Sequence, residues 1–456
     1  MISLDTTVIN VAFPTLRREF AVGIDEAQWV ISVYVLFLGI ATPLSGFLSD
    51  RFSIKRMYIA GLSVFVIGSL LCGLAPGLVP LIVARAVQGF GGGIAQPLGV
   101  AMLFMSFPPE EHGRAFGIWG LVMIVAPTLG PIIGGFLADR DLWRWIFFIN
   151  IPIGIAGMIL AANLLRLKEE KRFKPFNPLS IITAVLGVGS ILYATSAVNR
   201  YGWSSNLVIG VLLLGVVALC AFAIIDLRFT KAPLLDLRLF RKRTFLWASL
   251  IGYMAVLALF GADFLLPIYL QALRGLTALQ SGMILLPLAI AAGLMNPVAG
   301  RLYDKIGPRP LVITGSSLLL VNTWQFAHLA ADTPISRIIV LLVLRGLAVS
   351  LIMQATFTGA LSKVTRRACP RGSSLVNSTR FVVQALGVTL LATALSSALS
   401  SEVMNFQQLA QNGDGFLQGL ERAYTITFYA ALAALLMGML LPGWPRPWRS
   451  SSRFIK

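Results

Sequence analysis

The amino-acid sequence predicts an all-α polytopic membrane protein. Hydrophobic residues make up 57% of the 456-residue chain and charged residues only 12%, and the mean hydropathy is +0.82, far from the composition of a soluble chain. Apolar stretches follow one another, each long enough (roughly 20 residues) to cross a bilayer as a helix. The run from Leu207 to Ile225 is apolar on every face, unlike the alternating pattern of a membrane β-barrel. A helix also satisfies its own backbone hydrogen bonds, as hydrocarbon requires.

Apolar runs between charged residues and Pro or Gly breaks define about fourteen spans. The first span is short, because a helix from Met1 to Leu16 reaches only about 24 Å against a hydrocarbon core of roughly 30 Å. We therefore expect a truncated first helix, with further apolar residues upstream; without them, Asp5 would lie at a frayed, water-accessible end. The predicted spans are residues 1–19, 27–48, 57–75, 79–104, 115–138, 145–165, 179–198, 206–225, 246–270, 281–299, 311–329, 336–358, 376–399 and 423–441.

The basic residues predict the orientation. With the N-terminus inside, 26 of the 37 Lys and Arg residues fall in cytoplasmic loops and the tail, eight fall outside and three lie within spans. This skew follows the positive-inside rule. We expect a multi-pass protein of the plasma (inner) membrane with both termini in the cytoplasm. The net charge of +18 then reflects loops that face anionic lipid, and no soluble segment is present to bind nucleic acid.

An internal repeat divides the chain. The segment Pro43-x-x-Gly46-x-Leu48-x-Asp50-Arg51 recurs as Pro297-x-x-Gly300-x-Leu302-x-Asp304-Lys305. An arginine, Arg85 or Arg345, lies early in the second helix after each copy. The repeat predicts two six-helix halves. The expected domains are residues 1–166, two inserted spans in 167–230, residues 231–442 and a cytoplasmic basic tail, 443–456.

Four motifs occur in a characteristic order. They are the segment from Leu4 to Pro14, the segment from Gly46 to Arg56, Arg85 with Gln88-Gly89-Phe90-Gly91-Gly92-Gly93, and the segment from Ala126 to Gly135. Together they resemble the major facilitator superfamily, and specifically its fourteen-span drug:proton antiporter branch, the EmrB/QacA group. The resemblance implies alternating access driven by a proton gradient without a cofactor, and lipophilic, often cationic substrates. It also implies that the fourth helix lies near the first.

Three charged residues within spans are candidates for proton coupling or substrate binding. Asp5 is an intramembrane carboxylate, a costly feature that indicates function and one that can take and release a proton. Arg85 supplies a fixed positive charge, and the resemblance makes Asp5 its expected partner; a purely structural ion pair is the alternative. Asp263 lies four residues before Pro267, the place that Asn10 holds before Pro14. The repeat therefore points Asp263 toward the shared cavity, where it would suit a cationic substrate or a second proton.

Three further groups of residues have expected roles. Polar residues within spans could line the cavity or join helices: Asn10, Gln96, Asn296, Gln354 and Arg380. Small residues and a proline favour close helix approach and a bend that could act as a pivot: Gly130, Pro131, Gly134 and Gly135. Loop residues could cap helices or form gating pairs, although the positive-inside rule alone accounts for the basic ones: Gly46, Asp50, Arg51, Arg56, Gly300, Asp304 and Arg309. Ser53 stands where the resembled motif has glycine, and the second copy keeps Gly307.

No enzymatic constellation is found, so we expect no catalytic residue. The sequence has two histidines and neither a zinc-protease motif nor a phosphate-binding loop. Cys72, Cys220 and Cys369 are scattered, which favours buried, inert thiols over a metal site or disulfide. The predicted function is proton-coupled multidrug efflux of lipophilic, cationic compounds. Export of another small metabolite, or a non-coupled channel or receptor, is the alternative. The expected partners are the small-molecule substrate, the lipid bilayer and, in a cell with two membranes, a periplasmic adaptor protein.

Overall fold

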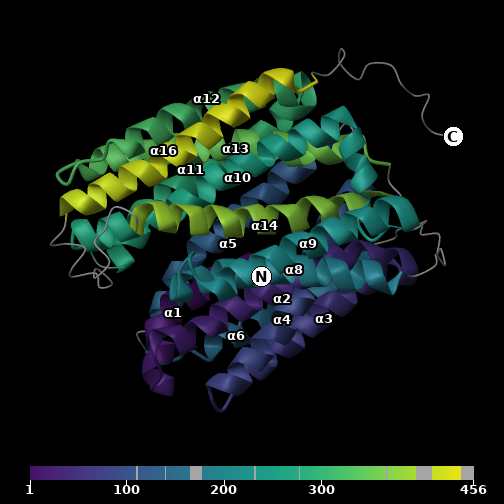
Figure 1. Ribbon diagram of the computed structural model, residues 1–456, viewed down its shortest axis with the longest axis horizontal. Coiled ribbons are helices and arrows are strands. Elements are labelled where there is room, and N and C mark those ends of the chain that lie inside the picture. The colour runs from purple at the N-terminus through teal and green to yellow at the C-terminus, as the bar shows by residue number, and fades with distance from the viewer. Residues whose placement is uncertain are drawn as a thin grey trace. The chain divides into compact units, whose positions relative to one another are not determined.

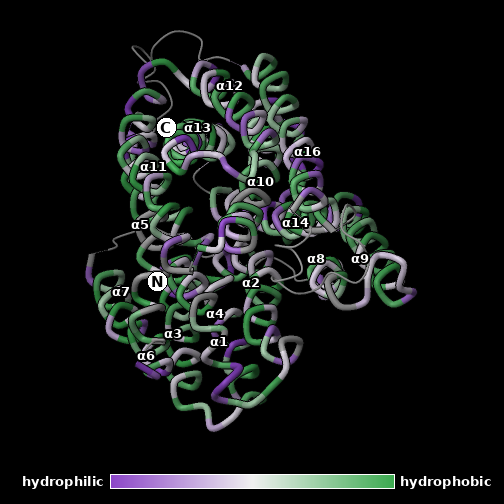
Figure 2. The backbone as a smooth tube through the Cα atoms, turned by 90° about the vertical axis from the view of Figure 1, so that its left-hand side faces the viewer, coloured by the Kyte–Doolittle hydropathy of each residue, from purple (hydrophilic) through white to green (hydrophobic). Residues whose placement is uncertain are grey.

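The chain is helical throughout the part described by the computed structural model, which covers residues 1–108, 111–138, 140–164, 177–230, 233–276, 278–365, 368–396 and 413–442 (Figure 1). Within these ranges there is no β-strand. Each of the fourteen predicted spans coincides with one helix or with two consecutive helices. Among the described residues, ten helices are long and apolar enough to cross a membrane, and hydrophobic residues dominate along the helices (Figure 2).

The chain divides into two compact units, which are described separately. Unit 1 comprises residues 1–106, 126–239 and 365–385, and unit 2 comprises residues 107–125, 240–364 and 386–456. Two helices, α5 (His112–Ala138) and α14 (Cys369–Ser396), belong to both units, because each begins in one and ends in the other. The predicted domain boundaries at residues 166, 230 and 442 remain predictions, and the tail 443–456 lies outside the described residues.

Unit 1 contains the first helices of the chain and the inserted pair. Its elements besides the ends of α5 and α14 are α1 (Ile2–Phe20), α2 (Ile24–Phe52), α3 (Ile54–Gly73), α4 (Leu78–Ser106), α6 (Trp145–Phe148), α7 (Asn150–Leu164), α8 (Pro178–Tyr201), α9 (Asn206–Ile224), the π-helical turn η2 (Ile225–Phe229) and the 3₁₀ turn η3 (Leu237–Arg241), which ends in unit 2.

Unit 2 holds the second copy of the repeat. Its elements are α10 (Arg243–Ile268), the π-helical turn η4 (Tyr269–Leu273), α11 (Ala278–Ile306), α12 (Pro308–Ala327), α13 (Ile335–Ser362) and α16 (Gly413–Leu440), together with parts of α5 and α14. The α12 and α16 helices run side by side (Figure 1), and Phe326 of α12 stacks on Tyr424 of α16 with ring centroids 5.4 Å apart.

Glycines bring α4 into close contact with α2 and α3. A side chain at Gly89 would meet the backbone of Tyr34, one at Gly91 the backbone of Phe65, and one at Gly93 the backbone of Leu38. Small residues let helix backbones approach closely in a membrane protein. The glycine-rich stretch of α4 is therefore a packing surface, and it brings the preceding turn, with Arg85 and Gln88, close to both neighbouring helices.

The inserted helices α8 and α9 pack against each other, and α8 packs on α2. The second inserted helix continues beyond its predicted end at residue 225, through η2 to Phe229. Asp226, which the sequence places in a loop, is buried in η2. Its carboxylate accepts hydrogen bonds from the Ser180 hydroxyl (2.7 Å) and from the backbone N–H groups of Leu234 and Leu235 (both 3.2 Å). These bonds tie the inserted pair to the segment that follows it.

In each copy of the repeat, a tight turn connects two helices, and the two turns are equivalent. Ser53 joins α2 to α3 with φ 92°, and Gly307 joins α11 to α12 with φ 82°. The serine therefore adopts the left-handed backbone that favours glycine. Its side-chain oxygen accepts a hydrogen bond from the backbone N–H of Arg56 (3.4 Å), so it also caps α3.

Candidate functional site

Asp5 is completely buried inside unit 1, although it lies near the first residue of α1. Its side chain has no exposed surface. One oxygen, Oδ2, accepts from Arg85 Nη1 at 2.5 Å, and the other, Oδ1, accepts from Gln88 Nε2 and Asn150 Nδ2, both at 2.9 Å. A buried carboxylate must be paired and hydrogen-bonded to remain ionised, and these three donors supply both requirements. The sequence left open that Asp5 lies at a frayed, water-accessible helix end. The structure instead shows it buried.

Arg85 is also fully buried and is held by more than its ion pair. Its Nε donates to the backbone oxygen of Val30 at 3.0 Å, and Nη1 also donates to Gln88 Oε1 at 2.6 Å. The guanidinium lies 4.0 Å from the centroid of the Tyr34 ring and 5.9 Å from that of Phe147. These contacts with α2, α4 and α6 fix the charge in place, and a flat guanidinium can make them together where a lysine could not.

Ser69, Gln88 and Asn150 complete the site, which we call the Asp5–Arg85 network. Gln88 Nε2 and Asn150 Nδ2 both donate to Ser69 Oγ, at 2.6 and 3.2 Å. The network thus joins side chains from α1, α3, α4 and α7. Three buried atoms in it, Arg85 Nη2, Asn150 Oδ1 and Tyr34 Oη, have no hydrogen-bond partner among the described residues.

Sequence reasoning identified two members of this network and missed the rest. Gln88 belongs to the motif quoted with Arg85, and its spacing of three residues places it on the same helix face, so that signal was available. Ser69 and Asn150 are single polar residues in apolar runs. Nothing in the sequence shows that their helices meet at Asp5.

The small-residue motif of α5 packs on the helix that carries Asp5. A side chain at Gly130 would collide with Thr7 of α1, and both Gly130 and Gly134 are buried. The helix runs without interruption from His112 to Ala138. The motif therefore allows close approach of α5 to α1. The surroundings of Pro131 and Gly135 are not among those described, and the predicted bend stays a prediction.

The second half of the repeat has its own buried arginine. Arg345 in α13 is 2% exposed, and its Nη2 donates to the backbone oxygens of Ala258 and Leu259 in α10 at 3.0 and 2.9 Å. Asp263 lies about one turn further along α10, but its side chain, like that of Asn10 in α1, lies outside the described residues. The predicted roles of Asp263 and Asn10 stay predictions.

In unit 1, the last turns of α2, where the sequence predicted loop residues, contact the N-terminal end of α14. Asp50 forms an ion pair with Arg371, whose side chain is almost buried. Gly46 lies against the backbone of Pro370 and Arg371, where a side chain would not fit comfortably. Sequence reasoning named Asp50 and Gly46 but not Arg371, which is one of several basic residues in its loop. Arg51 and Arg56 are exposed.

In unit 2, the last turns of α11, again predicted as loop residues, contact the N-terminal end of α5. Asp304 accepts hydrogen bonds from the backbone N–H groups of Gly113 (2.9 Å) and Arg114 (3.0 Å). A carboxylate is favourable there because it satisfies free N–H groups and the helix dipole. Gly300 faces Gly113 without room for a side chain. The first repeat copy thus holds a helix end by an ion pair, and the second copy holds one by a helix cap. Arg309 is exposed.

The four remaining cavity candidates belong to two units, two residues to each. In unit 2, Gln354 Nε2 donates to the Gly113 backbone oxygen at 2.9 Å, and Asn296 packs against Gly120 of α5. In unit 1, Gln96 is half-buried, and its Oε1 has no hydrogen-bond partner within the described ranges. Arg380 in α14 is also half-buried. Gln354 and Asn296 therefore both contact α5, and the predicted roles of all four residues stay predictions.

None of the three cysteines, all of which the structure describes, forms a disulfide bond, and one expectation about them is wrong. Cys72 and Cys369 are buried, but Cys220 is exposed, because it lies on an outer face of α9. Over the residues that the structure describes, no group of three or more His, Cys, Asp or Glu residues could hold a metal ion.

Comparison with known proteins agrees with this architecture. Residues 1–388 match the family model described as Major Facilitator Superfamily. The lincomycin resistance protein LmrB of Bacillus subtilis (strain 168) is 31% identical over 435 residues, which cover 94% of this chain and 91% of LmrB. The multidrug resistance protein B homolog of Mycobacterium tuberculosis (strain ATCC 25618 / H37Rv) is 29% identical over 469 residues, covering 97% and 87%.

A solved structure shares the fold. The human organic anion transporter MFSD10 (TETRAN) superimposes with a TM-score of 0.66 at 12% identity, over 96% of this chain and 98% of that one. The chain belongs to the major facilitator superfamily. It is a multi-pass membrane protein of a family of transporters, not of enzymes.

Proposed function

We propose that this protein exports lipophilic, cationic compounds in exchange for protons, and that Asp5 carries the proton. The observation that supports this most strongly is the burial of Asp5 against Arg85, Gln88 and Asn150. All three residues donate hydrogen bonds to the carboxylate oxygens. Protonation of Asp5 weakens these bonds, and therefore loosens the junction of α1, α4 and α7. This link between protonation and helix packing is what exchange transport requires.

Drug export is supported by the relatives. The names of two similar proteins refer to lincomycin resistance and to multidrug resistance. We propose the fourteen-span drug:proton antiporter branch, because a helix coincides with each predicted span and the inserted pair α8 and α9 lies between the repeat copies. The skew of basic residues supports cytoplasmic termini in the plasma (inner) membrane. In a cell with two membranes, a periplasmic adaptor would complete the export path.

The first test is dye-driven proton release from inverted membrane vesicles. Addition of ethidium to energised vesicles with the wild-type protein is expected to release protons, and Asp5→Asn is expected to reduce this at least about tenfold, since it removes the titrating group. Asp263→Asn tests the second candidate acid. Asp332→Asn, at an exposed position between α12 and α13, is the control and should resemble wild type.

Two outcomes would contradict the proposal. If ethidium is exported while the proton gradient is unchanged in every variant, the exchange mechanism is wrong. If ethidium crosses the membrane passively in both directions and independently of Asp5, the protein is a channel. Export of other solutes but not of lipophilic cations would favour a metabolite exporter.

A further inference from the structure

Asn150 belongs to the Asp5–Arg85 network, but its hydrogen bonds are incomplete. It is the first residue of α7 and is 1% exposed. Its Nδ2 donates to Asp5 Oδ1 at 2.9 Å and to Ser69 Oγ at 3.2 Å. Its Oδ1, in contrast, is buried and has no hydrogen-bond partner among the described residues. A buried acceptor without a partner is unfavourable, so this oxygen requires an explanation.

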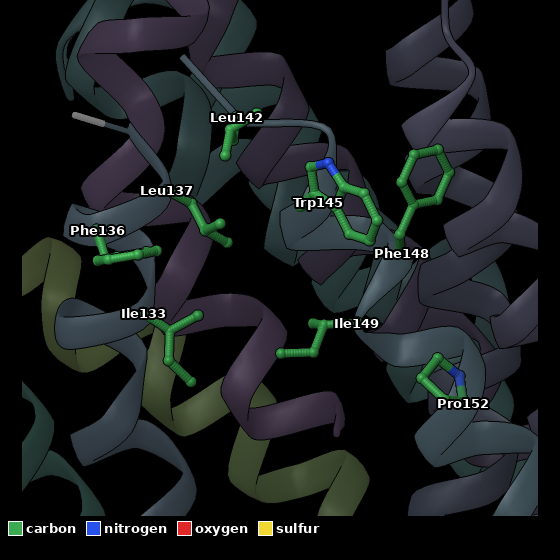
Figure 3. Close-up of a pocket in the computed structure, with 8 residues that line it drawn as sticks. All are labelled: Ile133, Phe136, Leu137, Leu142, Trp145, Phe148, Ile149 and Pro152. Atoms are coloured by element: carbon green, nitrogen blue, oxygen red, sulfur yellow. The ribbon is translucent and has the colours of Figure 1, made fainter. Parts of the chain in front are cut away.

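The residues before Asn150 explain why its side chain points into unit 1. Phe148 and Ile149 line an apolar groove between α5 and the α6–α7 segment (Figure 3). Phe147 lies beside the Arg85 guanidinium, and residues three apart share one face of a helix. Asn150 is therefore on the face that meets the network, while the groove is on another face of the same helix.

An ionised carboxylate and a protonated carboxyl group need different partners. The ionised form only accepts hydrogen bonds, whereas the protonated form also has an O–H group that donates. Arg85 has no acceptor atom, so it can serve only the acceptor oxygens of Asp5. Within the network, the acceptor for a protonated Asp5 must therefore be an oxygen of Gln88, Asn150 or Ser69.

Gln88 is held in one orientation by the arginine. Its Oε1 accepts from Arg85 Nη1 at 2.6 Å, and its Nε2 donates to Asp5 and Ser69. Turning this amide end for end would place its NH₂ group against the guanidinium, donor against donor. Asn150 has no such restraint, because its oxygen has no partner among the described residues. Its amide can exchange oxygen and nitrogen in almost the same volume.

We propose that Asn150 is a positioning residue that holds Asp5 in both of its charge states. This inference rests on the proposed function of Asp5 as the proton carrier. When Asp5 takes a proton from solvent, Oδ1 becomes an O–H group and the carboxyl group loses its negative charge. The Asn150 amide then turns, and its Oδ1 accepts from that O–H and from the Ser69 hydroxyl. That hydroxyl accepts two hydrogen bonds and donates none among the described residues.

The orientation of the Asn150 amide depends on Asp5 and Ser69. The far end of the amide meets no hydrogen-bonding group among the residues that the structure describes, so it favours neither orientation. At the near end, an ionised Asp5 needs a donor and a protonated Asp5 needs an acceptor. One buried amide therefore adapts the network to either charge state without the movement of a helix.

An infrared measurement tests this turn directly. Asparagine labelled with carbon-13 in its side-chain carbonyl is incorporated into the protein, which is purified in lipid nanodiscs. Spectra recorded at acid and alkaline pH are then subtracted. We expect a labelled carbonyl band that moves to lower frequency at acid pH, because Asn150 Oδ1 then accepts two hydrogen bonds where it accepted none.

Two variants assign this band. It should vanish in Asn150→Leu, which removes the amide at similar volume, and in Asp5→Asn, which removes the titrating group. If Asn150→Leu does not fold, Asn150→Thr gives the same assignment. A band shift that other groups around Asp5 cause would persist in Asp5→Asn and would overturn the inference. Those charged or titratable groups are Arg85, Tyr34, Cys72 and the amino group of Met1.

Asn322→Leu is the matched control. Asn322 of α12 in unit 2 is fully buried, and its Nδ2 donates to the Leu341 backbone oxygen at 2.6 Å. Like Asn150, it has an Oδ1 without a hydrogen-bond partner among the described residues. The band should remain in this variant. Asparagine carbonyl bands that do not respond to pH, or a response that survives in Asn150→Leu, would contradict the inference.

Dye-driven proton release gives a second measurement. Asn150→Leu is expected to slow it about tenfold, the effect of one lost hydrogen bond. Asn150→Thr, whose hydroxyl can donate or accept, should recover most of the rate. Wild-type proton release by Asn150→Leu would exclude the role of Asn150. If instead the wild type shows no carboxylic-acid band of Asp5 at any pH, the proposed function itself fails, so the two failures are distinguishable.

Discussion

At the scale of single residues, the central feature is an ion pair that water does not reach. Taking two charges out of water is unfavourable, and their attraction compensates only when the remaining hydrogen-bonding groups are satisfied. Here Gln88, Asn150 and Ser69 surround Asp5, while the Val30 carbonyl and the Tyr34 ring hold Arg85. The pair is therefore expected to be sensitive to the loss of either partner.

A double-mutant cycle tests this sensitivity. Asp5→Asn leaves the Arg85 charge buried without its counter-ion, and Arg85→Gln leaves the Asp5 charge; each is expected to destabilise by about 3 kcal/mol. The double variant buries neither charge, so its loss should be smaller than the sum of the two single losses. Thermal unfolding in detergent measures the cycle. Simple additivity would show that the two residues do not act as a pair.

At the scale of elements, the turn between α2 and α3 holds backbone strain. Ser53 has φ 92°, a conformation that side chains rarely adopt, whereas the equivalent turn uses Gly307 at φ 82°. Such strain amounts to about 1–3 kcal/mol, and replacing a serine cap by glycine loses only a few tenths of a kcal/mol. The first repeat copy therefore keeps the turn of the second despite its different residue, because the packing of α2 and α3 determines the backbone.

Ser53→Gly is accordingly expected to stabilise the protein by about 1 kcal/mol. The reciprocal change, Gly307→Ser, introduces the same strain and should destabilise it by a similar amount. The unfolding midpoints of both variants in detergent check the prediction, with wild type between them. A lower midpoint for Ser53→Gly would mean that its cap on α3 matters more than the backbone.

At the scale of the whole molecule, α5 and α14 are the helices that belong to both units, because each begins in one unit and ends in the other. The N-terminal end of α14 is held by Asp50 through Arg371, and that of α5 by Asp304 through Gly113 and Arg114. Any rearrangement that moves one unit against the other must move these helices. We propose that the two carboxylates stabilise one state of the transporter.

Removing either carboxylate charge should slow transport without weakening substrate binding. Asp50→Asn loses an ion pair and Asp304→Asn weakens a helix cap, each a change of about 1 kcal/mol that shifts a two-state population several-fold. Export of ethidium at saturating concentration and its Kd are the measurements. Wild-type export rates in both variants would exclude a gating role for these residues.

The sequence could predict much of the helical order but only part of the site. Helices follow from local hydrophobicity, so a helix coincides with each predicted span, although α14 and α16 begin well before the predicted starts at residues 376 and 423. Asp226 shows the limit: as a charged residue it was assigned to a loop, yet η2 buries it because Ser180 and two backbone N–H groups, none of them its neighbours in sequence, satisfy its oxygens.

The sequence by itself determined that this is a helical membrane protein with an internal repeat, and it singled out Asp5 and Arg85. These conclusions depend on hydropathy and on the presence of charge within apolar runs, which are properties of the chain alone. Only the tertiary structure decided that Asn150 and Ser69 join Asp5, and that Phe148 and Ile149 face a groove on the opposite side of the same helix. Such contacts arise between residues far apart in sequence, because close helix packing brings their side chains together.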